Sequence, residues 1–149
     1  MVNARSYIRQ PPLALLALLL TLSLAPLRAG EPWTDKELKD PAALVATLGN
    51  SKAAQPVILN VGPVQQIKGA IAIGPAAVQK NLDKLKQYLA KLPKDREVII
   101  YCGCCPFRRC PNIRPAFELL KKMKFAKAKL LNLPTSLNED WISKGYPME

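Results

Sequence analysis

The sequence of 149 residues contains no histidine. This absence excludes Ser-His-Asp and Cys-His catalysis, Cys₂His₂ zinc fingers, and copper or haem sites with histidine ligands. Aromatic residues are also scarce, at 6%. The lysines that give the chain a net charge of +11 are not interleaved with an aromatic platform, so we expect no nucleic-acid partner. Any catalysis must use groups other than imidazole.

The chain does have a cluster of cysteines. All four lie within nine residues, at Cys102, Cys104, Cys105 and Cys110. Cysteines this close together cannot staple distant parts of a small domain to each other. They mark one place in the fold. The chain length and the apolar content of 49% suit a single globular domain around that place.

The first 29 residues have the pattern of a signal peptide. Two arginines precede an apolar run from Leu13 to Leu24, and Leu27-Arg28-Ala29 forms a cleavage site. The run is shorter than the roughly 20 residues that span a membrane. The alternative is that the leader is not cleaved and anchors the protein in the membrane, and we expect no other contact with a membrane. We expect residues 30–149 to form a periplasmic or secreted domain, with its thiols outside the reducing cytosol.

Apolar runs and amphipathic segments alternate after the leader. Strands are predicted at Pro56–Val61, Gly69–Gly74, Glu97–Cys102 and Lys129–Leu133. Helices are predicted at Trp33–Leu48 (one or two), Ala76–Leu92 and Ala116–Met123, with a last turn at Asn138–Lys144. This alternation predicts a small α/β domain with a mainly parallel central sheet flanked by helices. Ligands bind such sheets beyond the carboxyl ends of the strands, which is where Cys102 is expected.

The segment that follows Cys102 has the composition of an anion-binding loop. Backbone N–H groups at a helix N-terminus can cradle an anion and lower the pKa of a thiol held among them. Arg108, Arg109 and Arg114 add positive charge that can bind an oxyanion. A nucleophilic sulfur in such a cradle can attack a sulfane sulfur, a disulfide or a phosphate, and we expect no cofactor.

Several segments resemble the rhodanese-like sulfurtransferase domain. They are Val57–Val61 for its first core strand, Lys68–Ile71 for its Gly-Ala-Ile segment, Val98–Cys102 for the strand that presents the catalytic cysteine, and Trp141 with Gly145–Pro147 for its C-terminal signature. The resemblance implies that Cys102 holds a sulfane sulfur as a persulfide and that Arg108 or Arg109 orients the donor. The implied donor is a small sulfur-containing anion, a thiol or a persulfide.

The chain departs from the rhodanese-like pattern around this cysteine. The family's Asp-Val-Arg is Asn60-Val61-Gly62 here, its histidine is replaced by Lys68, and the loop after Cys102 is longer. The extra cysteines, Cys104, Cys105 and Cys110, are predicted to resolve a persulfide or to form a disulfide. Gly103, Phe107 and Arg114 are predicted to contact the substrate.

Three alternatives stay open. The thiols suit Cu(I) or zinc, although the spacing lacks the paired Cys-x₂-Cys of common zinc sites. The spacing of Cys102 and Arg108 formally matches the loop of the cysteine phosphatases. The third alternative is an inactive rhodanese-like interaction domain whose loop is tied by a disulfide. Whichever of these applies, Phe107 is expected to be exposed at the loop tip, where it would offer a docking surface for a protein partner.

Overall fold

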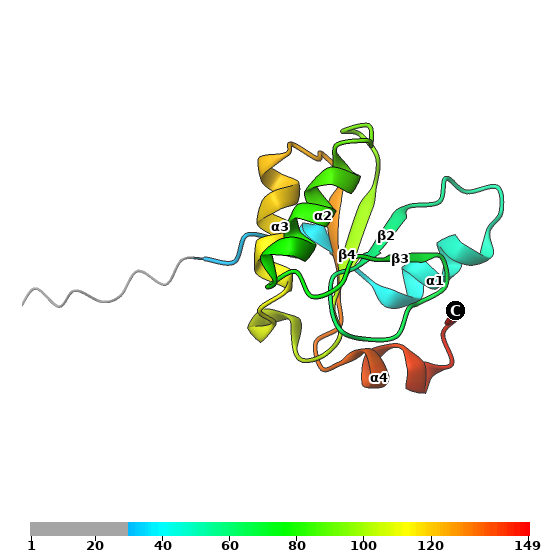
Figure 1. The fold of residues 1–149 in the computed structure, drawn as a ribbon. Helices are drawn as coiled ribbons and strands as arrows, with labels where there is room; N and C mark the ends of the chain where they lie inside the picture. Colours follow the sequence, from blue (N-terminus) through cyan, green and yellow to red (C-terminus); the bar gives the residue numbers. More distant parts are fainter. Residues whose placement is uncertain (1–29) are drawn as a thin grey trace, which may run out of the picture.

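Five short strands form the centre of the protein in the computed structural model, which describes residues 30–149 (Figure 1). They are β1 (Leu38–Lys39), β2 (Val57–Asn60), β3 (Ala70–Ala72), β4 (Val98–Tyr101) and β5 (Ala128–Leu131). The strand order is β1-β5-β4-β2-β3, and all neighbouring pairs are parallel. The predicted α/β class with a parallel central sheet is therefore confirmed. The signal peptide predicted for residues 1–29 lies outside the described residues.

Four helices cover the two faces of the sheet (Figure 1). Residues of α2 (Gln79–Leu89) and α3 (Ile113–Lys122) share one apolar cluster, and residues of α1 (Pro41–Gly49) and α4 (Leu137–Asp140) share the other. In residues 30–149, no helix is both long enough and apolar enough to cross a membrane.

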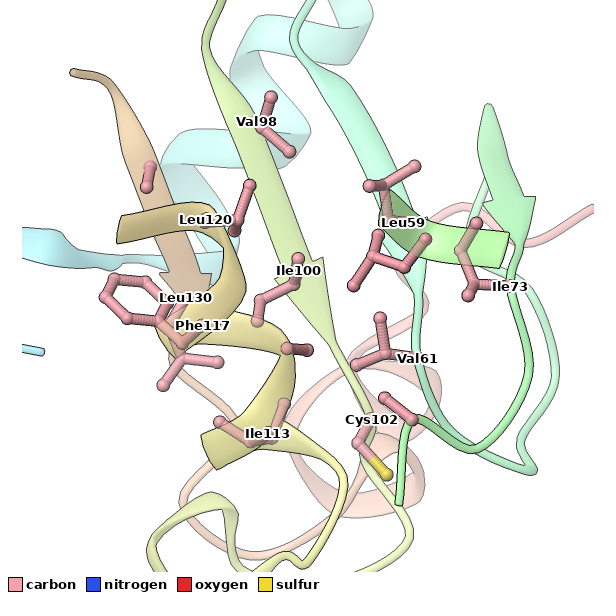
Figure 2. Packing of buried hydrophobic residues seen from close by; sticks show 14 of the residues in the cluster. Leu59, Val61, Ile73, Val98, Ile100, Cys102, Ile113, Phe117, Leu120 and Leu130 are labelled. Carbon is pink, nitrogen blue, oxygen red and sulfur yellow. The ribbon is translucent and has the colours of Figure 1, made fainter. Parts of the chain in front are cut away.

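The central strands are buried on both faces, as their continuous apolar runs predict. Leu59 and Ile100 face the cluster under α2 and α3 (Figure 2). Ile58 and Ile99 belong to the opposite cluster. All four are essentially inaccessible to solvent. Burying each such side chain stabilises the fold by about 1.5–3 kcal/mol relative to leaving it exposed. The sheet is therefore a rigid platform for the loops at its carboxyl edge.

The N-terminal helical segment differs from its prediction. A short 3₁₀ helix (Asp35–Glu37) and the two-residue strand β1 precede α1, which begins only at Pro41. Asp40 caps this helix by accepting a hydrogen bond from the N–H of Ala43 (2.8 Å), and a proline is favourable in the first helical position. β1 exists because it pairs with β5. A strand of two residues has no periodicity that the sequence could reveal.

The order of the strands reverses between β2 and β4. From β2 the chain passes to β3 on one side, and it then crosses through α2 to β4 on the other side of β2. Loops that leave two strands in opposite directions open a crevice at their carboxyl ends. Gly62 and Cys102, which follow β2 and β4, lie against each other at this point.

Candidate functional site

The four cysteine sulfurs gather in one cluster at the carboxyl end of β4, as the sequence predicts. The sulfur of Cys104 is central: it lies 3.2 Å from the sulfur of Cys102, 3.2 Å from that of Cys105 and 3.9 Å from that of Cys110. All four are free thiols. A disulfide sulfur–sulfur bond measures about 2.05 Å, so small loop movements would join Cys104 to a neighbour.

Burial divides this cluster into an inner and an outer layer. Cys102 and Cys110 are only 1% and 4% exposed and belong to the apolar core under α3, whereas Cys104 is exposed and Cys105 is half-buried. Cys102 lies beyond the end of β4 beside Val61 (Figure 2). The cysteine that the family resemblance assigns as the nucleophile is therefore in the inner layer.

Cys110 lies at the N-terminus of α3. Its sulfur accepts a hydrogen bond from the Cys102 thiol, which is the main cause of a pKa lowered to about 5. Burial opposes this shift, and the backbone N–H groups of Asn112 and Ile113 and the Cys104 thiol reinforce it. Unpaired N–H groups and the positive end of a helix dipole favour an anion at this position. The site therefore favours the thiolate form of Cys110.

Cys102 is instead held in its neutral, protonated form. Its hydrogen bond to Cys110 and its burial raise the pKa of the Cys102 thiol far above the ordinary range, although the Cys104 N–H partly offsets the shift. Burial and the contact with Cys104 likewise raise the pKa of Cys105 to about 12. The backbone N–H groups of Asn112 and Ile113 thus favour an anion on Cys110 and not on Cys102, and a cradle for a bound oxyanion stays a prediction.

Asn112 also belongs to the site, although it is not among the predicted site residues. It is 4% exposed. Its side-chain N–H donates to the sulfur of Cys102 (3.4 Å), and its carbonyl oxygen accepts from the N–H of Ala77 (3.0 Å). Asn112 thus joins the start of α3 to the segment before α2 and to the inner layer of thiols. The sequence does offer a signal for this residue: an amide side chain just before a predicted helix, two residues after the last cysteine.

The three arginines lie at the rim of the site. Arg108 forms an ion pair with Glu31, and Arg114 donates to the carbonyl of Gly30 (3.0 Å). Arg109 is exposed. Between residues 30 and 149, no hydrogen bond joins an arginine to a cysteine sulfur. A direct role for these side chains in orienting an anion stays a prediction, and so does the phosphatase alternative, although Arg108 pairs with Glu31 in this structure.

The predicted exposure of Phe107 is wrong. The residue begins a short 3₁₀ helix (Phe107–Arg109) that turns its ring inward, where it is 4% exposed. The ring meets Trp33 edge to face at a centroid distance of 5.9 Å. Phe107 therefore anchors the loop in the core and cannot supply the exposed docking surface or the substrate contact expected of it.

Gly103 has a structural role in turning the loop. It adopts a left-handed conformation (φ 70°), and its carbonyl accepts a hydrogen bond from the N–H of Leu137 (2.9 Å). A Cβ atom here would lie 2.6 Å from the Cβ of Leu137. Glycine is therefore required for this turn against α4, and the predicted substrate contact of Gly103 gains no support from its buried position.

Gly62 makes room for the inner thiol. A Cβ at this position would overlap the sulfur of Cys102 and come within 3.0 Å of its Cα and carbonyl oxygen. The buried Asn60 holds the turn by accepting from the N–H of Gly62 (3.0 Å) and donating to the carbonyl of Val64 (2.8 Å). The departure from the family's Asp-Val-Arg is thus matched to the buried position of Cys102.

We expect Gly62→Ala to destabilise the protein by about 2 kcal/mol, since overpacking a tight core typically costs about 1–3 kcal/mol. The midpoint of denaturant unfolding measures this loss. Gly49→Ala is the matched control, because no heavy atom lies within 4 Å of its added Cβ. Equal midpoints for the two variants would show that Cys102 does not pack against Gly62 in solution.

The sulfurs of Cys102, Cys104 and Cys110 lie within 4.8 Å of one another, so a soft metal ion is also compatible with this cluster. The chain matches no protein-family model, and it matches no curated protein. Membership of the rhodanese-like family therefore stays a prediction beside the confirmed α/β architecture.

Proposed function

We propose that this protein is an exported rhodanese-like sulfurtransferase or thiol-redox protein that carries sulfane sulfur as a persulfide on a cysteine of the Cys102–Cys110 loop. The observation that carries the proposal is the contact of the Cys104 sulfur with the three other sulfurs at distances of 3.2–3.9 Å. A free thiol in contact with three others can accept a sulfur atom, which a neighbouring thiol can then resolve.

The reaction has two covalent steps. A cysteine thiolate attacks the outer sulfur of a donor such as thiosulfate, the donor's S–S bond breaks, and sulfite leaves with the electron pair. A neighbouring thiol then attacks the cysteine sulfur of the persulfide, so that a protein disulfide forms and hydrosulfide leaves. An external dithiol reduces the disulfide and restores the starting state. Every atom and electron is accounted for by the donor, the cysteines and this reductant.

Two features of the site favour this chemistry. The Cys102 thiol and the backbone N–H groups of Asn112 and Ile113 lower the pKa of Cys110, and such N–H groups can also stabilise the negative charge of a persulfide. The arginines at the rim, Arg108, Arg109 and Arg114, raise the local concentration of an anionic donor through their field. Neither feature requires histidine, which the chain lacks.

Mass spectrometry of the protein after incubation with thiosulfate tests the proposal. We expect the wild-type protein to gain one sulfur or to lose two hydrogens, and to release sulfide when dithiothreitol is present. A variant with all four cysteines replaced by serine is the control and should do neither. A wild-type protein that takes no sulfur from thiosulfate or from a persulfide donor would overturn the proposal. Stoichiometric copper or zinc in that sample would favour the metal-binding alternative.

A further inference from the structure

The sulfurs of the cluster differ in whether a donor can reach them. Displacement at a sulfur needs an approach in line with the bond that breaks, so the attacking thiol must be accessible from outside. Cys102 and Cys110 are 1% and 4% exposed, and Cys105 is half-buried. Cys104 is exposed and contacts each of the others.

On the basis of the proposed function, we infer that Cys104 is the thiol that exchanges sulfur with donors in solution and that Cys110 resolves the resulting persulfide. Cys102, at the position that the family resemblance assigns to the nucleophile, stays reduced as a buried hydrogen-bond donor. The family's single-cysteine cycle is thereby replaced by a two-cysteine cycle on the loop.

Geometry selects Cys110 as the resolving partner. Cys105 adjoins Cys104 in sequence, and consecutive Cα atoms lie about 3.8 Å apart, below the usual 4.4–6.8 Å of disulfide-bonded residues. The sulfur of Cys102 lies 3.2 Å from that of Cys104, but Asn112 and the tight contact with Gly62 fix Cys102 in place. The sulfur of Cys110 lies 3.9 Å from that of Cys104, and the N-terminus of α3 favours its anionic form.

The proton balance follows from the same contact. Cys104 passes its proton to the Cys110 thiolate and attacks the outer sulfur of thiosulfate, which leaves a Cys104 persulfide anion and sulfite. Cys110 then attacks the Cys104 sulfur, and its proton moves to the departing sulfur, which leaves as hydrosulfide. The product is a Cys104–Cys110 disulfide, which an external dithiol reduces. Without a reductant, each protein molecule should release one sulfide.

Single-turnover reactions with thiosulfate test this division of labour. We expect Cys104→Ser to slow sulfur uptake by about a hundredfold or more, because the exchanging nucleophile is lost. Cys110→Ser should accumulate a persulfide on Cys104 and release no sulfide until a thiol is added. Cys102→Ser and Cys102→Ala should slow uptake by about tenfold at most, because they change the pKa of Cys110 but leave the exchanging thiol in place. Circular dichroism checks that each variant is folded.

A second arm needs no sulfur transfer. Trace alkylation of the reduced wild-type protein should label Cys104 first, and mild oxidation by diamide should produce a Cys104–Cys110 disulfide by peptide mapping. A persulfide on Cys102, or folded Cys102 variants as inactive as Cys104→Ser, would overturn the assignment and leave the proposed function standing. Cys104-first labelling and the mapped disulfide in a protein that no donor loads would support the assignment and reject the proposed function.

Discussion

A thiolate absorbance with a midpoint near pH 5 is expected in the reduced wild-type protein and should be missing from Cys110→Ser. The hydrogen bond from Cys102 and the N–H groups of Asn112 and Ile113 stabilise the charged form and lower the pKa of Cys110. The thiolate therefore forms as the pH rises through about 5. An ordinary thiol, with a pKa near 8.5, is only about 1% ionised at pH 6.5, so the difference in thiolate fraction there is about a hundredfold.

Asn112→Asp tests whether the charge next to Cys110 sets the midpoint of this titration. The carboxylate has nearly the shape of the amide, and it keeps an oxygen to accept from the N–H of Ala77. Its negative charge at the start of α3 opposes a second anion, so we expect the midpoint of Cys110 to rise by about one pH unit. The absorbance difference between each protein and its Cys110→Ser counterpart isolates this one thiol. A wild-type midpoint near 8.5 would contradict the proposed position of Cys110 in the cradle.

A strand or helix could be predicted from the sequence wherever its own residues form an apolar run or an amphipathic pattern. The apolar runs at β2, β3, β4 and β5 and the amphipathic pattern of α2 predict those elements to within a few residues. The two-residue strand β1 could not be predicted, because only its pairing with β5 makes it a strand. The sequence predicts the start of α3 at Ala116, three residues after its actual start at Ile113, because Pro115 is typical of a loop although it is compatible with a first helical turn.

The position of the site could also be predicted, whereas the roles of its thiols could not. Cysteine spacing and the strand before Cys102 place the cluster at a strand end. Which thiol is buried depends on residues far away in sequence, such as Gly62 behind Cys102 and Trp33 behind Phe107. Which thiol is favoured as the anion depends first on the neighbouring Cys102 thiol and then on the N–H groups at the start of α3. A prediction from the loop alone therefore cannot tell the buried thiols from the exposed one, and it places Phe107 at the surface, where the structure does not have it.

Phe107→Ala should destabilise the protein by about 3 kcal/mol, since truncating a buried aromatic ring typically costs about 3–5 kcal/mol. The ring is 4% exposed and packs edge to face on Trp33, so its loss leaves a cavity between the loop and the N-terminal segment. The ring also holds the 3₁₀ helix that leads into Cys110, whose N–H donates to the Phe107 carbonyl (3.2 Å). We therefore expect Cys110 to become more accessible as well as the fold less stable.

Phe125→Ala separates these two effects. Phe125 is also 4% exposed and belongs to the same apolar cluster, but it follows α3 and lies outside the cysteine loop. Both variants should lower the midpoint of denaturant unfolding by a similar amount, because both remove a buried ring. Only Phe107→Ala should speed alkylation of Cys110 under native conditions. Equal acceleration in both variants would mean that global unfolding exposes the thiol, and the loop would then not depend on Phe107 as its anchor.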